Sequence, residues 1–265
     1  MQTTTSPLKW AGGKRWLVPY IQPIWKNYKD FRLVEPFCGG LSIAIGVKPK
    51  LALLNDINPH VINFYLWLKK GLRITTLMQN DSVSYYEYRD YFNYLIRANR
   101  HTSKKSAELF YYLNKTCFNG LCRFNKSGEF NVPFGRHGTI NYKVDFLEYK
   151  EIFLNWGFTA NPYSSITLKN NDFVFADPPY DVKFRNYSKD GFSWNDQIEL
   201  TEWLNKHKGP IVLCNQATDR IIELYTNNGF HINFLTERIN IKANGDRTPA
   251  NVVIATKNIM LDFSG

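Results

Sequence analysis

The chain has few cysteines, and neither its cysteines nor its histidines are spaced for a metal site. Its 265 residues include four cysteines and five histidines, without a CxxC, HxH or HxxxH pattern. This composition excludes a small scaffold stapled by disulfides and disfavours a zinc module. We therefore expect no metal and reduced, core-like cysteines in a cytoplasmic protein, at Cys38, Cys117, Cys122 and Cys214.

Long apolar runs are also missing. No stretch approaches the roughly 18–20 apolar residues of a spanning helix, and Met1–Ser6 lacks the apolar core of a signal peptide. Nor does the sequence contain a long basic amphipathic helix that would lie on a membrane. Yet Lys and Arg outnumber Asp and Glu by 33 to 23, which gives a net charge of +10. A surplus of this size favours a polyanionic partner, and nucleic acid is the better candidate.

The glycine-rich motifs of dinucleotide and nucleoside triphosphate sites, GxGxxG and GxxxxGK[ST], are absent. A glycine turn at 39–40 nevertheless separates an expected strand at 31–35 from a helix, as in the first unit of a Rossmann-like sheet. A second apolar strand ends at Asp56, where nucleoside-binding folds place an acid that bonds ribose hydroxyls. Asn58 or Asp56 is expected to cap a helix from Pro59 to about Lys69. These features favour a small nucleoside cofactor without a pyrophosphate.

A third strand-end acid stands in Phe173–Tyr180, which reads FVFADPPY. The apolar run suits a strand buried on both faces, and the two prolines end it. Asp177 would then lie at the carboxyl end of a strand, where open α/β sheets hold their ligands. The alternative is a strand that ends in a Pro-Pro turn, with Asp177 capping the next segment.

Between about Gly71 and Asn161 the alternation of strands and helices lapses. A helix is expected over 82–100, with core aromatics on one face, and a second one around 109–113. The segment 114–136 mixes Asn, Arg, Gly and aromatics and is expected to carry a hairpin with its tip at 126–128. Asn and Arg are the side chains that read base edges, although an ordinary surface hairpin has the same composition.

The α/β pattern returns near the carboxyl end of the chain. Helices are expected over 194–206 and 218–227, and a strand over 210–214. Strands at 230–237 and 252–256 are predicted to pair antiparallel, joined by a basic loop over 238–249.

Six motifs in this order resemble the Dam family of DNA adenine-N6 methyltransferases, in its alpha group (the D12 class), over nearly the whole chain. They are KWAGGK at 9–14, EPFCGG at 35–40, DIN at 56–58, NGLCR at 119–123, GEFNVPFGR at 128–136 and DPPY at 177–180. The resemblance implies an α/β, Rossmann-like methyltransferase sheet (1–56 and 162–265) with an inserted, mainly helical target-recognition domain (57–161). It also implies methyl transfer from S-adenosylmethionine to an adenine in double-stranded DNA, with S-adenosylhomocysteine as product. The target site would resemble GATC. The enzyme is expected to be nucleoid-associated and to act as a monomer.

Site residues carried over from the family fall into three groups. Contacts to the donor would come from Trp10, Lys14, Glu35, Phe37, Gly39, Gly40, Asp56 and Asp177. Catalysis would involve Asp177, Pro178 and Tyr180. Contacts to DNA would come from Lys9, Phe118, Asn119, Leu121, Arg123, Asn131, Pro133 and Arg136. Without the resemblance, Trp10 and Lys14 would equally suit a buried Trp beside a solvated Lys.

The chemistry accounts for the strand-end acid. The exocyclic amine of adenine is a poor nucleophile, and acceptors at Asp177 and at the Pro178 carbonyl would aim its lone pair at the methyl group. Two alternatives remain open, an RNA or protein-amide methyltransferase of similar core and a catalytically silent DNA-binding module. Protein-amide enzymes of this kind usually show Asn where this chain has Asp177. Roles in restriction–modification, in a phage or in host regulation are all compatible with this activity.

Overall fold

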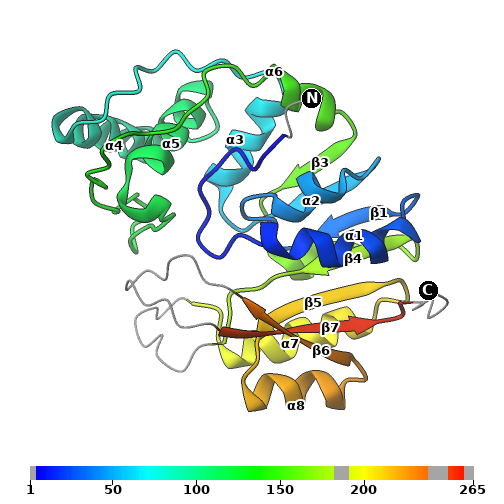
Figure 1. The fold of residues 1–265 in the computed structure, drawn as a ribbon. Coiled ribbons are helices and arrows are strands. Elements are labelled where there is room, and N and C mark those ends of the chain that lie inside the picture. The colour runs from blue at the N-terminus through cyan, green and yellow to red at the C-terminus, as the bar shows by residue number, and fades with distance from the viewer. Residues whose placement is uncertain (1–3, 182–190, 238–249, 260–265) are drawn as a thin grey trace. The chain divides into compact units, whose positions relative to one another are not determined.

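The computed structural model describes residues 4–181, 191–237 and 250–259 and divides the chain into two compact units (Figure 1). The first unit comprises Met1–Pro19, Gly39–Lys48 and Asp56–Ala160. The second comprises Tyr20–Cys38, Pro49–Asn55 and Asn161–Gly265. The basic segment 238–249, expected as a loop, lies outside the described residues.

A mixed sheet forms the centre of the second unit. Its strands follow one another in space in the order β2-β1-β4-β5-β7-β6. Strands β2, β1, β4 and β5 are parallel, whereas β7 runs antiparallel to both β5 and β6. The predicted α/β class and the antiparallel pair at the end of the sheet are confirmed. The strands are β1 (Arg32–Glu35), β2 (Ala52–Asn55), β4 (Asp172–Ala176), β5 (Ile211–Gln216), β6 (His231–Glu237) and β7 (Ala250–Lys257).

The direction in which strands are added reverses between β1 and β4. The chain places β2 on one side of β1, with Leu33 opposite Ala52, and later places β4 on the other side, with Leu33 opposite Phe173. Because these strands are parallel, their carboxyl ends share one edge of the sheet. Ligands of open α/β sheets bind at such a switch point.

Helices cover both faces of this sheet. Side chains of α7 (Trp194–Asn205) and α8 (Asp219–Asn227) share an apolar core with Val34 and Val174 on one face. On the other face, the rings of Trp25 and Tyr28 lie 5.3 and 5.5 Å from that of Phe173, which joins α1 (Val18–Lys26) and the residues after it to the sheet. Neighbouring residues of one strand thus face opposite layers, as the pleat requires.

The first unit is mainly helical, and its core is rich in aromatic rings. Phe64 of α3 stacks on Tyr111 of α5 with centroids 5.4 Å apart and rings 9° from parallel. Tyr85, Phe92 and Leu95 of α4 are buried, as predicted from their helical spacing. The elements are η1 (Arg15–Leu17), α2 (Ser42–Val47), α3 (Pro59–Lys69), α4 (Ser82–Arg97), α5 (Lys104–Thr116), η2 (Phe118–Gly120), α6 (Leu147–Ile152) and β3 (Trp156–Thr159).

Two expectations about this unit are wrong in detail. The helix expected over 82–100 ends at Arg97, because the chain turns at Asn99 with a φ of +54°. Strand β3 lies where no strand was expected.

Among the described residues, no helix combines the length and the apolar character that crossing a bilayer requires.

Candidate functional site

Asp56 is fixed by main-chain donors in the first unit. Its Oδ2 accepts a hydrogen bond from the N–H of Gly39 (3.0 Å) and its Oδ1 accepts one from the N–H of Asn58 (2.9 Å). Burial raises the pKa of this carboxyl, and the two N–H donors oppose that rise. The hydroxyl of Tyr65 donates to the Gly39 carbonyl at 2.5 Å, so the glycine is held on both sides. The arrangement presents a rigid carboxylate next to a glycine turn.

Trp10 packs directly on that turn. A Cβ atom added to Gly39 would lie 2.5 Å from the indole Nε1, and one added to Gly40 would lie 2.7 Å from the Trp10 Cβ. Gly39 also has a φ of +42°. Only glycine therefore allows the ring this close. Lys14 is 6% exposed, and its Nζ donates to the Gly12 carbonyl at 2.6 Å.

In the second unit, the other expected donor and catalytic residues follow β1 and β4. Glu35 ends β1 and is 3% exposed, and the ring of Phe37 lies 5.5 Å from that of Tyr163 and 5.6 Å from that of Phe192. Asp177 comes directly after β4, so it shares the switch-point edge of the sheet with Glu35. The next described helix, α7, is capped by Ser193 and not by Asp177.

The expected hairpin is present in the first unit. Phe124 bridges Phe130, and the N–H of Gly128 donates to the Asn125 carbonyl at 2.9 Å, which closes the tip over 126–128 as predicted. At its base, the N–H of Phe118 donates to the Pro133 carbonyl at 2.9 Å. The hairpin thus brings several predicted DNA-contacting residues together on one element: Phe118, Asn119, Leu121, Arg123, Asn131, Pro133 and Arg136.

Arg123 and Asn131 face each other across this hairpin. The guanidinium donates from Nε to Oδ1 of Asn131 (2.8 Å) and from Nη2 to its main-chain carbonyl (3.1 Å). Arg123 is nonetheless exposed, as are Phe118 and Asn119. Asn119 has a φ of +54°, a left-handed conformation that Asn tolerates better than most residues. These three side chains, which are predicted to contact DNA, are therefore at the surface.

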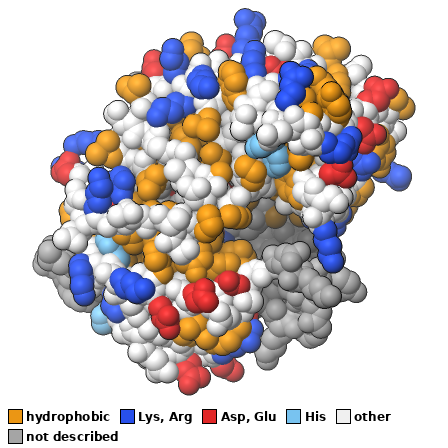
Figure 2. Space-filling model, turned by 180° about the vertical axis from the view of Figure 1, so that it is seen from behind, with side chains coloured by type: hydrophobic (Ala, Val, Ile, Leu, Met, Phe, Trp, Pro, Cys, Tyr) orange, Lys and Arg blue, Asp and Glu red, His pale blue; other side chains and the backbone are white. Residues whose placement is uncertain are grey.

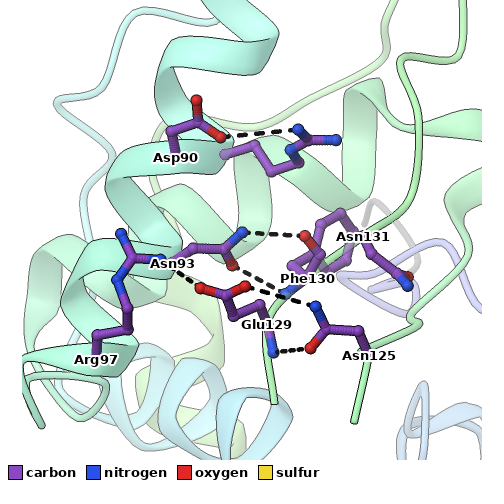
Figure 3. A pocket seen from close by; sticks show the side chains of 8 residues that line it. Asp90, Asn93, Arg97, Asn125, Glu129, Phe130 and Asn131 are labelled. Carbon is purple, nitrogen blue, oxygen red and sulfur yellow. Dashed lines mark hydrogen bonds and ion pairs between the residues drawn. The ribbon is translucent and has the colours of Figure 1, made fainter. Parts of the chain in front are cut away.

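Helix α4 holds one strand of the hairpin, and the two line a pocket of about 390 Å³ (Figure 3). The side chain of Asn93 points at Phe130, and Arg97 pairs with Glu129 beside it. The role of Asn93 was not predicted, because an Asn within a helix gives no signal of such a contact.

Lys9 lies at the carboxyl end of α5, next to the hairpin base. Its N–H donates to Oδ1 of Asn114 (2.9 Å), and its Nζ donates to the Lys115 carbonyl (3.0 Å). Burial lowers the pKa of Lys9, and it lowers that of Lys115 to about 8, with a further contribution from Lys9. A Cβ atom on Gly120 would meet Lys9 Cβ at 2.6 Å, so this glycine lets the hairpin reach the N-terminal segment.

Asn58, the N-cap of α3, and His60, within α3, contact residues of the hairpin. Asn58 caps α3 as predicted, accepting from the N–H of His60, and its Nδ2 also lies 3.3 Å from the sulfur of Cys122. The ring of His60 stacks on that of Phe124, with centroids 4.8 Å apart. Burial, and secondarily His101, lowers the pKa of His60 to about 4, so the ring is neutral near pH 7.

Charge and metal ligands add two observations. Lys and Arg side chains are scattered over the face shown in Figure 2 and do not gather into one patch there. Within the described ranges, no three His, Cys, Asp or Glu side chains are grouped to hold a metal ion.

Comparisons with known proteins agree with one another. A family model described as D12 class N6 adenine-specific DNA methyltransferase matches residues 10–241. The Retron Ec67 DNA adenine methylase of Escherichia coli is 33% identical, over 94% of this chain and 90% of that protein. The DNA adenine methylase of Escherichia coli K12 is 30% identical, over 92% of each chain. The type II methyltransferase M.CviBI of Paramecium bursaria Chlorella virus NC1A is 32% identical, over 82% of this chain and 85% of that protein.

A solved structure of Trm5b from Pyrococcus abyssi also matches, with a TM-score of 0.37 and 13% identity over 94% of this chain and 50% of that one. The α/β fold follows from the strand order of the sheet and agrees with the matched family.

Proposed function

The chain belongs to the D12 class of N6 adenine-specific DNA methyltransferases, and on that premise we propose that it transfers a methyl group from S-adenosylmethionine to an extruded adenine in duplex GATC. The observation that carries this proposal is the position of the Asp177–Tyr180 motif. It follows β4 at the switch point of the sheet, on the same edge as Glu35. A carboxylate there suits a ligand-binding edge.

The donor-contacting role of Asp56 is supported by its geometry. Its carboxylate is oriented by two N–H donors, and its oxygens keep lone pairs that can accept from ribose hydroxyls. Gly39, with Trp10 packed on it, makes a turn that backbone and ligand can approach closely. S-adenosylmethionine supplies a methyl group already activated on a sulfonium. We assign its binding to Trp10, Lys14, Glu35, Phe37, Gly39, Gly40, Asp56 and Asp177.

The catalytic role falls to the residues after β4. The Asp177 carboxylate and the Pro178 carbonyl accept hydrogen bonds from the adenine amine, which directs its lone pair. Tyr180 stacks on the base, a contact worth about 1–3 kcal/mol. The amine cannot be reached within the duplex, so the base is extruded. Alignment and electrostatics then supply most of the rate enhancement.

Recognition of the sequence is assigned to the hairpin and to Lys9. Arg123 is exposed and carries the planar fork that reads guanine, and Leu121 and Pro133 lie on the same element for contact with a thymine methyl. Phe118 and Asn119 fill the space beside the extruded base. The remaining DNA contacts are assigned to Lys9, Asn131 and Arg136.

Methyl incorporation from labelled donor tests this function. Two duplexes that differ only by one base pair within GATC are compared, and the modified base is identified by sequencing. We expect labelling of the adenine in GATC alone. The Asp177→Ala variant should lose methyl transfer and keep specific DNA binding. Incorporation into RNA or protein instead, or none at all, would refute the proposal.

A further inference from the structure

The main chain on both sides of Tyr180 is held by two buried amide side chains. The carbonyl of Pro179, which precedes Tyr180, accepts a hydrogen bond from Nε2 of Gln197 at 2.9 Å. The N–H of Asp181, which follows Tyr180, donates to Oδ1 of Asn215 at 3.1 Å. Nδ2 of Asn215 in turn donates to Oε1 of Gln197 at 3.0 Å. One linked pair of amides, from α7 and β5, therefore fixes both peptide groups that flank Tyr180.

The chemistry of these groups leaves one orientation for each amide. A carbonyl can only accept and an N–H can only donate, so Gln197 must present its nitrogen to Pro179, and Asn215 must present its oxygen to Asp181. The remaining hydrogen-bonding capacity of Asn215 is also used, because Nδ2 donates to the hydroxyl of Tyr225 at 3.0 Å. Asn215 is 0% exposed and Gln197 is 1% exposed. Buried amides with this many partners are rigid.

The sequence of the loop explains why side chains hold it. Pro178 and Pro179 have no N–H groups, so this segment cannot be anchored by main-chain donors at those positions. Gln197 and Asn215 hold the loop at other groups, the Pro179 carbonyl and the Asp181 N–H. The loop thus depends on two buried amides, of which Gln197 lies 18 residues after Pro179 and Asn215 lies 34 residues after Asp181.

A second set of contacts fixes the side chain of Asp181. Its Oδ2 accepts from the hydroxyl of Thr218 at 3.1 Å and from Nε of Arg220 at 2.6 Å, and Nη2 of Arg220 donates to Oδ1. The guanidinium also lies over the ring of Trp194, 4.6 Å from its centroid. Asp181 is thereby held through its main chain and its side chain.

We propose that Gln197 and Asn215 are positioning residues that set the orientation of Tyr180 and, through it, of the stacked adenine during methyl transfer. This inference rests on the proposed function. Neither amide is assigned a contact with the base, since their hydrogen bonds go to the loop, to each other and, from Asn215, to Tyr225 and the N–H of Gln216. A displacement of about 1 Å at a reacting centre costs roughly 100-fold in rate, so loosening the loop should lower kcat.

Two isosteric variants test the proposal. Gln197→Glu places a carboxylate oxygen against the Pro179 carbonyl, and Asn215→Asp keeps the acceptor for the Asp181 N–H but loses both donors. We expect kcat for methyl transfer to fall roughly 100-fold in each, with KM for the donor and Kd for the duplex unchanged within about twofold. Matched controls are Gln22→Glu on α1 and Asn227→Asp on α8, both at exposed positions. These controls should keep the wild-type kcat.

A spectroscopic signature separates positioning from a general loss of structure. With 2-aminopurine at the target base, wild type should extrude the base and quench it by stacking on Tyr180. The Gln197→Glu variant should extrude it and leave it bright. In the Tyr180→Ala background, adding Gln197→Glu should cost little more in kcat, because the stack is already lost. If the decrease in kcat of the double variant equals the product of the decreases in the two single variants, the proposal is overturned.

Arg220→Gln covers the case in which the buried variants do not fold. Its side chain is 50% exposed, so the substitution leaves the core intact while removing the bidentate contact with Asp181. We expect kcat to fall several-fold with KM unchanged. If wild type is active and all three variants match it, this inference alone is overturned. If wild type transfers no methyl group, the proposed function fails and the inference fails with it.

Discussion

Asn93 on α4 makes both main-chain hydrogen bonds of Phe130 in the hairpin. Its Nδ2 donates to the Phe130 carbonyl at 3.1 Å, and its Oδ1 accepts from the Phe130 N–H at 2.9 Å. Two residues further on, the Val132 carbonyl accepts from the hydroxyl of Tyr85 at 2.7 Å. Asn131, which holds Arg123, lies between these two anchored residues. The helix therefore sets the position of the hairpin segment that supports Arg123.

Loss of this anchor should reduce sequence discrimination. Asn93→Leu leaves the two polar groups of Phe130 without their partners, so we expect unfolding to cost about 2–4 kcal/mol less. The ratio of kcat/KM between GATC and a duplex changed at the base pair that Arg123 reads should fall about tenfold. Steady-state kinetics on paired duplexes measure this ratio. Glu87→Leu, at an exposed position of the same helix, is the control, and equal ratios in both variants would contradict the anchoring role.

Arg123 should act on one base pair only. Replacing Arg123 with Lys removes the planar fork, and replacing it with Ala removes the whole contact. About 1–3 kcal/mol of discrimination at that base pair should therefore be lost. A panel of duplexes substituted one base pair at a time measures the change. Lys126→Ala at the exposed hairpin tip should instead leave relative preferences unaltered. Unchanged discrimination in Arg123→Ala would refute the assignment.

His60 should make the fold sensitive to acid. Its pKa is about 4 in the folded protein and about 6.5 when unfolded, so the unfolded chain binds more protons between these values. The contribution of His60 to the free energy of unfolding is complete above pH 6.5 and is lost as the pH falls towards 4. At pH 5 the loss is about 2 kcal/mol. Urea unfolding at pH 7 and pH 5 should show a smaller loss of stability in His60→Phe than in wild type. An equal loss in both proteins would count against this assignment.

The ion pair of Arg32 and Asp172 should stabilise the sheet where β1 and β4 begin. The guanidinium donates from Nε to Oδ1 (2.8 Å) and from Nη2 to Oδ2 (2.7 Å), and the Asp172 side chain is 0% exposed. Arg32→Met leaves that carboxylate buried without its cation, which should cost about 3 kcal/mol of stability. Thermal unfolding measures it.

The matched control for this pair is Lys50→Met, which breaks the exposed pair of Lys50 with Asp30 and should change the midpoint little. The double variant Arg32→Met/Asp172→Leu should recover part of the loss, because no charge then remains buried. If Arg32→Met unfolds at the temperature of wild type, the pair does not stabilise the sheet.

Features that follow from local chemistry were predictable from the sequence. Asn58 caps α3, Gly128 belongs to the hairpin tip, and the strand carrying Phe173 ends before Asp177, as expected. In each case, the residue type and its immediate neighbours determine the backbone conformation. The two strands β6 and β7 were predictable for the same reason, since each has its own apolar pattern.

What the sequence did not reveal depends on contacts between distant residues. Asn93, Gln197 and Asn215 are polar residues within regular elements, and their partners become apparent only when the chain is folded. Strand β3 has four residues, with only Trp156 fully buried, so its pattern is too short to recognise.

Because the hydrogen bonds of Asn93 and Tyr85 to the hairpin go to its main-chain atoms, exposed side chains of the hairpin can change while these bonds remain. If the hairpin reads bases as proposed, exchanging a few of its exposed residues should change the base preference while α4 stays as it is. The hairpin is thus the natural place to retarget this enzyme in the laboratory, and the helix beneath it should be left untouched.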